Sequence, residues 1–146
     1  MRIVPMKREG SVSCLANKFG AKTTITEDGM KFDSKKEYKR YCELMLLERA
    51  GKISGLERQP KFELIPTQYE ESTEVYKSGA KKGQPKPGYV IERSCTYVGD
   101  FAYWQDGKYI VEDVKGYQDP RSAAYAKFVI KRKLMLWVHG IQVKEV

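Results

Sequence analysis

Histidine and cysteine are scarce in this 146-residue sequence, which contains one histidine and three cysteines. The single histidine, His139, stands at the end of an expected helix, where it can interact favourably with the helix dipole, so histidine-based catalysis is disfavoured. The cysteines are Cys14, Cys42 and Cys95, and none belongs to a CxxC motif. Their odd number and wide spacing favour reduced thiols over a cysteine-bound metal. We expect Cys42 and Cys95 to be small core hydrophobes.

Long apolar runs are also missing. In the first half of the chain the longest run is Leu44 to Leu47, whereas a membrane-spanning helix needs about 20 apolar residues. The first ten residues lack the apolar core and small-residue cleavage site of an export signal. We therefore expect a cytoplasmic protein with no membrane partner.

Charge, in contrast, is abundant and biased towards one sign. The 27 Lys and Arg residues outnumber the 19 Asp and Glu residues, which gives a formal net charge of +8. A basic domain suits a polyanionic partner, because neutralising phosphates releases condensed counterions. Composition alone permits a nucleic-acid partner without requiring one.

The patterning predicts one α/β domain over residues 21–146, preceded by a flexible basic arm over residues 1–20. A polar stretch rich in Lys, Gly and Pro at 67–88 predicts a basic loop insertion. The expected elements are a hairpin over 22–32, a helix over 34–50, an extended segment over 53–66, strands over 89–104 and 108–115, a helix over 121–138 and a strand over 141–146. This order predicts a central mixed β-sheet flanked by helices.

One expected hairpin brings two aspartates together. Its turn is Asp106-Gly107, a favoured two-residue turn. Asp100 and Asp113 are equidistant from the centre of this turn, so they should face each other with Cβ atoms about 4.5–5.5 Å apart. Side chains two residues apart share a face of a strand, so Asp113 and Lys115 point the same way and Glu112 points away.

The pair Asp100 and Asp113 predicts a site for a divalent cation. Two carboxylates so close repel each other, and a hard cation with oxygen ligands relieves this repulsion. Such a metal can activate an attacking water, which Lys115 can orient or deprotonate. The natural substrate for this site on a basic surface is a phosphodiester. Glu37 could add a carboxylate from the first helix.

These residues resemble the PD-(D/E)XK nuclease superfamily, the fold shared by many restriction enzymes and Holliday-junction resolvases. Three phrases are similar, more narrowly, to a small phage-encoded family of that superfamily labelled as of unknown function. They are Lys31–Glu37, Leu56–Phe62 and Val111–Gly116, and the resemblance covers roughly residues 18–146. One departure is Gly99, which stands where the superfamily name has proline.

The resemblance implies a restriction-endonuclease-like core with Mg²⁺ or Mn²⁺ as cofactor. Asp100, Asp113 and the Val114 carbonyl would bind the metal, Lys115 would activate the nucleophile, and Glu37 would be the helix-borne acidic residue. By analogy the substrate would be branched DNA, as for a Holliday-junction resolvase in recombination, cut by a homodimer in the host-cell cytoplasm. The lysines and glutamine expected to contact DNA are Lys35, Lys36, Lys81, Lys82, Gln118, Lys127 and Lys131.

Each of these assignments has an alternative. The capping box Ser34–Glu37 explains Glu37 without chemistry, Asp113 and Lys115 could form a simple surface ion pair, and the helix lysines could be a solvated face. The insertion is either a DNA clamp or a disordered loop. A restriction or packaging nuclease is the alternative enzyme, and a non-catalytic DNA-binding module of the same fold is the alternative of another class. The aromatic residues expected in the core are Tyr41, Trp104 and Trp137.

Overall fold

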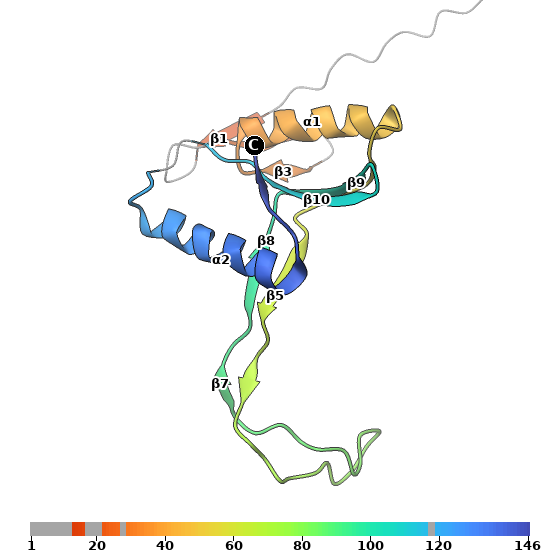
Figure 1. The fold of residues 1–146 in the computed structure, drawn as a ribbon, viewed down its shortest axis with the longest axis vertical. Helices are drawn as coiled ribbons and strands as arrows, with labels where there is room; N and C mark the ends of the chain where they lie inside the picture. Colours follow the sequence, from red (N-terminus) through yellow and green to blue (C-terminus); the bar gives the residue numbers. More distant parts are fainter. Residues whose placement is uncertain (1–12, 17–21, 27–28, 117–118) are drawn as a thin grey trace, which may run out of the picture.

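The computed structural model describes residues 13–16, 22–26, 29–116 and 119–146, which form an α/β fold with a mixed sheet flanked by helices (Figure 1). The N-terminal part contains β1 (Ser13–Ala16), β2 (Lys22–Ile25), β3 (Lys31–Phe32), α1 (Lys35–Arg49), β4 (Ser54–Arg58), β5 (Lys61–Ile65) and β6 (Gln68–Tyr69). The C-terminal part contains β7 (Val90–Glu92), β8 (Cys95–Val98), β9 (Phe101–Gln105), β10 (Lys108–Asp113), α2 (Ala123–His139) and β11 (Lys144–Glu145).

The central sheet has the strand order β11-β10-β9-β4. Its only parallel pair among the described strands is β10 with β11, while β9 runs antiparallel to both β10 and β4. The turn between β9 and β10 is Asp106-Gly107, where both residues have positive φ, as a type I′ turn requires. The strands pair in the expected register, with Glu112 opposite Phe101.

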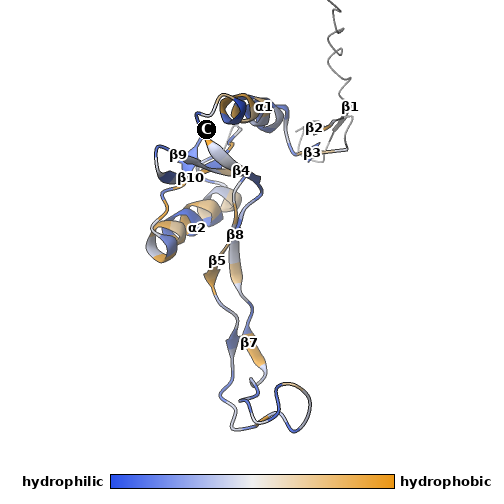
Figure 2. Cartoon of the chain, turned by 90° about the vertical axis from the view of Figure 1, so that its right-hand side faces the viewer, coloured by the Kyte–Doolittle hydropathy of each residue, from blue (hydrophilic) through white to orange (hydrophobic). Residues whose placement is uncertain are grey.

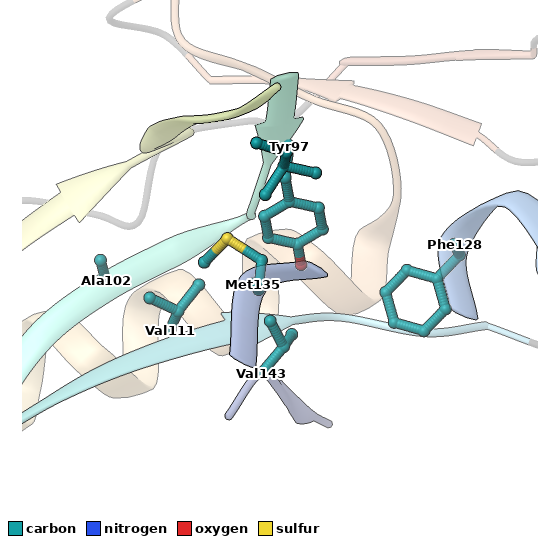
Figure 3. Close-up of a cluster of buried hydrophobic side chains, with 7 residues drawn as sticks. Tyr97, Ala102, Val111, Phe128, Met135 and Val143 are labelled. Atoms are coloured by element: carbon teal, nitrogen blue, oxygen red, sulfur yellow. The ribbon is translucent and has the colours of Figure 1, made fainter. Parts of the chain in front are cut away.

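The two helices cover opposite faces of this sheet. Leu44 of α1 packs with Ile53, Phe101 and Tyr103 on one face. On the other face, α2 contributes Phe128 and Met135 to a cluster that includes Ala102 and Val111 of the sheet (Figure 3). Because neighbouring strand residues point to opposite faces, β9 supplies residues to both cores.

Both helices begin at a serine cap. The Ser34 side chain accepts a hydrogen bond from Glu37 N, and Ser122 caps α2 through Tyr125 N. The helix expected over 34–50 is confirmed as α1, Lys35–Arg49. Helix α2 begins two residues later than expected, because Ser122 and not Pro120 provides its N-terminus. Among the described helices, none combines the length and the apolarity that a bilayer span requires.

A long two-stranded ribbon, residues 61–98, projects from the central sheet (Figures 1 and 2). It consists of the antiparallel pairs β5–β8 and β6–β7, extended by a bridge between Val75 and Pro85. The expected loop at 67–88 is therefore the outer part of an ordered hairpin. The outer end carries only basic charged residues, Lys77, Lys81 and Lys82. The inner part carries Glu70, Glu71 and Glu74, together with Lys86 beside Glu74.

Four expectations are corrected by the structure. Within the expected arm of residues 1–20, Ser13–Ala16 forms β1 and pairs with β2, and the other residues of that range lie outside the described part. Cys42 is exposed, because α1 packs on the sheet through Leu44 and its neighbours on one face. Trp137 is 86% exposed on the outer side of α2. Trp104 is half exposed beside the Tyr109 ring. Tyr41 is partly buried against the α1 core, as expected.

Candidate functional site

Strand β10 presents Asp113 and Lys115 on the face that α2 covers. The Lys115 ammonium lies 2.8 Å from Asp113 Oδ1 and 3.7 Å from the centre of the Phe128 ring. Phe128 therefore holds the ammonium by a cation–π contact while Asp113 pairs with it. The i, i+2 spacing brings the two side chains together, as predicted from strand geometry.

Asp100 directly precedes β9. Its N–H donates to the Glu112 carbonyl at 3.0 Å, beside the Phe101–Glu112 pair at which the register of β9 and β10 ends. Its Oδ2 accepts a hydrogen bond of 2.6 Å from Val114 N. The pKa of Asp100 is raised to about 7, chiefly by burial and also by the negative charges of Asp113 and Glu37, against the opposing Val114 hydrogen bond. Asp100 and Asp113 therefore lie within electrostatic reach of each other, although the paired register of β9 and β10 ends at Phe101 and Glu112, one residue before them.

The backbone of Asp100 is held by a segment that sequence reasoning did not assign to the site. Gln59 N donates to the Asp100 carbonyl at 2.9 Å, and Gly99 N donates to the Pro60 carbonyl at 3.1 Å. A proline at position 99 would lack this donor. A Cβ atom at Gly99 would also lie 2.9 Å from Val111 Cγ1. These two constraints give a physical reason for glycine where the superfamily pattern has proline.

Tyr97 is the second contributor that the sequence did not reveal. Its hydroxyl donates to Asp113 Oδ2 at 3.0 Å, and its side chain is buried in the α2-side core. Burial and the Asp113 charge raise the pKa of Tyr97, which keeps the hydroxyl protonated as a donor. Asp113 is thereby fixed at both oxygens, by Tyr97 and Lys115. A carboxylate offers about four lone-pair positions, so acceptor capacity is left at both oxygens.

Glu37 is 4% exposed and performs a capping role. Its Oε2 accepts from Asp33 N at 2.8 Å, while its own N–H donates to Ser34 Oγ at 3.1 Å. Burial raises the pKa of Glu37, partly offset by the Asp33 hydrogen bond. Its charge also contributes to the raised pKa of Asp100, so the two carboxyl groups lie within electrostatic reach of each other. The capping alternative is thus observed, and a catalytic role is a proposal.

Glu112 points to the opposite face, as predicted, and it is fully buried and paired there. Arg40 binds it through two hydrogen bonds of 2.8 Å, and Tyr103 Oη and Lys144 Nζ donate to Oε1 at 2.6 and 3.1 Å. Burial alone would raise the pKa of Glu112, but these donors lower it below its usual value. The network ties α1 and β11 to the strand that carries Asp113.

A groove of about 310 Å³ opens between β8, β10 and α2. It is lined by Thr96, Tyr97, Val98, Asp113, Lys115, Ala124, Lys127, Phe128 and Lys131. Lys127 is exposed at its rim, whereas Lys131 Nζ donates to the Thr96 carbonyl at 2.6 Å. Three lysines thus surround the groove that contains Asp113. This arrangement can attract a phosphate, because the groove carries more positive than negative side chains.

The other residues expected to bind DNA are dispersed. Lys35 is exposed on α1, and Lys36 Nζ donates to the carbonyls of Lys115 and Val146 at 2.6 and 2.8 Å. Lys81 and Lys82 lie in the turn that closes the outer end of the ribbon, where Lys82 N donates to Gly79 O and Gln84 N to Lys81 O. Figure 1 shows that the ribbon extends away from the central sheet. Gln118 lies outside the described residues.

The oxygen donors fit a divalent cation in kind, though they are few. In the described part of the chain, no cluster of three or more His, Cys, Asp or Glu side chains could hold a metal. The Val114 carbonyl supplements Asp100 and Asp113. Lys115 N donates towards Val146, and in a trans peptide the Val114 carbonyl points the opposite way, to the edge where Asp100 lies. One or two carboxylates with several waters is the usual Mg²⁺ environment, so Asp100, Asp113 and the Val114 carbonyl are oxygen donors of the right kind.

Comparison with known proteins gives one match. A family model described as "Protein of unknown function (DUF1064)" matches residues 16–139, which is most of the chain. No curated protein and no solved structure matches significantly. The matched region contains every described residue of the site.

Proposed function

The chain belongs to the DUF1064 family of proteins of unknown function, and we propose that it is a metal-dependent endonuclease that hydrolyses DNA phosphodiesters. One observation carries this proposal. Asp100, directly before β9, and Asp113, the last residue of β10, lie within electrostatic reach of each other, and Lys115 lies 2.8 Å from Asp113 in a lysine-rimmed groove. A partly buried Asp100 close to the buried Asp113 is costly to fold unless a ligand uses the two carboxylates.

The arrangement of elements supports a restriction-endonuclease-like core. The order α1, β4, β9, β10, α2, β11 is helix, three strands, helix, strand, the order that the resemblance to PD-(D/E)XK nucleases implies. The sheet is mixed, and the candidate residues lie at the end of the β9–β10 hairpin opposite its turn. This arrangement supports the roles that the resemblance implies for Asp100 and Asp113 as metal ligands and for Lys115 as the lysine.

In the proposed reaction, Asp100, Asp113 and the Val114 carbonyl would hold Mg²⁺ or Mn²⁺, which when bound would supply Lewis-acid activation of the phosphate and of water. Tyr97 fixes the orientation of Asp113. Lys115 donates hydrogen bonds to the attacking water or a phosphate oxygen from within the groove, and Lys127 binds a neighbouring phosphate at the rim. The substrate we propose is branched DNA, by analogy with the Holliday-junction resolvases that the sequence resembles.

The test uses labelled four-way junctions, linear duplexes and single strands, each with Mg²⁺, Mn²⁺ or EDTA. We expect metal-dependent nicks, preferentially in the junction, that Asp113→Asn abolishes and Lys115→Met reduces by about 10²–10⁴-fold. Asp119→Asn is the matched control, because Asp119 is exposed and pairs only with Arg121 among the described residues. Cleavage of linear DNA alone would remove the junction assignment and leave a restriction-like or packaging-like nuclease.

A second candidate function is DNA binding without cleavage. It is favoured by the Asp113–Lys115 ion pair and by the lack of a third metal-binding side chain among the described residues. In that case the protein would bind junction DNA in a salt-sensitive manner with every metal and produce no nicks. Such a result would refute the endonuclease proposal and support this one.

A further inference from the structure

The ribbon exposes large apolar side chains along its middle. Tyr89 is 83% exposed, Ile91 61% and Val90 52%, and Tyr69 opposite Val90 is about half exposed. Figure 2 shows the hydrophobic colour of β7 on a ribbon that extends away from both helices. An isolated two-stranded hairpin is only marginally stable in water, and exposed apolar patches mark interaction surfaces. The middle of the ribbon therefore has the character of an interaction surface.

The charges on the ribbon are separated along its length. The tip, residues 77–83, contains Lys77, Lys81 and Lys82 and no acidic residue. Further in, Glu70, Glu71 and Glu74 line a hollow of about 390 Å³ beside Tyr89. Lys86 neutralises one of them, since its Nζ lies 3.2 Å from Glu74 Oε2. Glu70 and Glu71 form no ion pair with any described residue. One ribbon thus carries a basic end and an acidic, partly apolar hollow.

The tip has a defined shape before any partner binds. Tyr76 N donates a hydrogen bond to the Gln84 carbonyl at 3.0 Å, and Gly83 N donates one to the Tyr76 carbonyl at 2.9 Å. Lys82 N donates to Gly79 O at 3.1 Å within the turn. These bonds hold Lys81 and Lys82 on a closed turn, so less ordering entropy is lost when the tip binds.

We propose that two copies of this chain pair through their ribbons, with the lysine tip of each copy in the glutamate-lined hollow of the other. A two-fold axis makes each contact occur twice. The basic segment of each ribbon then faces the acidic segment of the other copy. DNA along the inner part of the ribbon would meet Glu70, Glu71 and Glu92 between the basic residues, so the ribbon offers no continuous basic track for phosphates. Tyr89 borders the hollow and would be covered by the incoming tip.

This pairing is tested by sedimentation velocity on the full chain over a series of concentrations. We expect a dimer that weakens as salt rises, because exposed charges are screened beyond about 10 Å at 0.1 M salt. Lys81→Glu with Lys82→Glu should raise the dimer dissociation constant by about tenfold or more, since each substitution acts at both contacts. Glu70→Lys with Glu71→Lys should do the same.

The decisive variant combines all four substitutions. It reverses both segments, so it should restore the dimer, which distinguishes lost pairing from a ribbon that fails to fold. The matched control is Lys52→Glu with Lys108→Glu, two exposed lysines outside the ribbon whose reversal should leave the dimer unchanged. A monomer at all concentrations, or a dimer indifferent to the ribbon charges, would overturn the inference.

The outcomes also separate this pairing from the proposed nuclease activity. A monomer that nicks DNA would refute the pairing and support the nuclease proposal. A ribbon-dependent dimer that never cuts DNA would support the pairing and refute the nuclease proposal. If the tip substitutions weaken DNA binding and leave the oligomeric state unchanged, the ribbon is a DNA clamp and the pairing is refuted.

Discussion

Replacing Asp100 by asparagine should stabilise the folded protein while removing activity. Asparagine keeps an oxygen that can accept the Val114 hydrogen bond, and it removes the charge that burial, Asp113 and Glu37 disfavour. The pKa of Asp100 is raised from 3.8 to about 7 on folding. The protonated form therefore favours the fold at low pH, and this contribution is lost as pH rises through about 7.

The size of the effect follows from the pKa. A rise from 3.8 to about 7 is equivalent to about 4 kcal/mol at pH 8, since one pH unit corresponds to about 1.36 kcal/mol. Asp100 is only partly buried, so solvent screening lowers the expected gain to about 2 kcal/mol. For a chain of this length that gain raises Tm by roughly 6–8 °C. The gain should shrink towards pH 4, where the unfolded carboxyl is also protonated.

The assay is urea unfolding of wild type and Asp100→Asn at pH 4 to 8 in EDTA, with Asp119→Asn as control. Adding Mg²⁺ at about 100 times its dissociation constant should then stabilise the wild type by about 2.7 kcal/mol and the variant much less. Equal stability of the two proteins at pH 8 in EDTA would refute the reasoning, because it would mean that Asp100 is not under electrostatic strain.

Two further predictions concern the supports of the site. Arg40→Ala leaves Glu112 buried without its bidentate partner and should cost about 3 kcal/mol in the free energy of unfolding by urea. Tyr97→Phe removes the hydrogen bond to Asp113 and should cost about 1 kcal/mol while lowering kcat with KM unchanged. Tyr89→Phe, which alters an exposed side chain, should change neither the free energy of unfolding nor kcat. An equal loss of kcat in both tyrosine variants would contradict the positioning role of Tyr97.

Sequence patterns predicted the parts of the fold that local interactions determine. The Asp106-Gly107 turn determines the register of β9 and β10 because a two-residue turn allows only one pairing. The Ser34 cap likewise determines where α1 begins. The exposure of Trp137 was not predictable in this way, because hydrophobic spacing on α2 does not show which side faces the sheet.

The candidate site likewise contains residues that local sequence patterns relate to one another and residues that only the tertiary fold brings in. Asp100 and Asp113 are related by a short hairpin, and Lys115 follows on the same strand. Tyr97 and the Gln59–Pro60 segment lie at the base of the ribbon, one on each side of the long hairpin. They are far apart in sequence, so no short-range pattern connects them to the site. The one usable signal was Pro60, which interrupts an otherwise extended segment and marks the place where the backbone turns towards Gly99.

The parallel pairing of β11 with β10 has a consequence for the dynamics of the site. The two-residue strand β11 holds the end of β10 through Val146, whose N–H donates to Asp113 O and whose carbonyl accepts from Lys115 N. Short elements with few buried contacts open at lower free energy than the rest of a sheet. Undocking of β11 would release the peptide groups around Lys115 while β4, β9 and most of β10 stay paired. In native-state hydrogen exchange, the Lys115 amide should therefore exchange well before the amides of Ala102 and Val111, as a local opening at the candidate site.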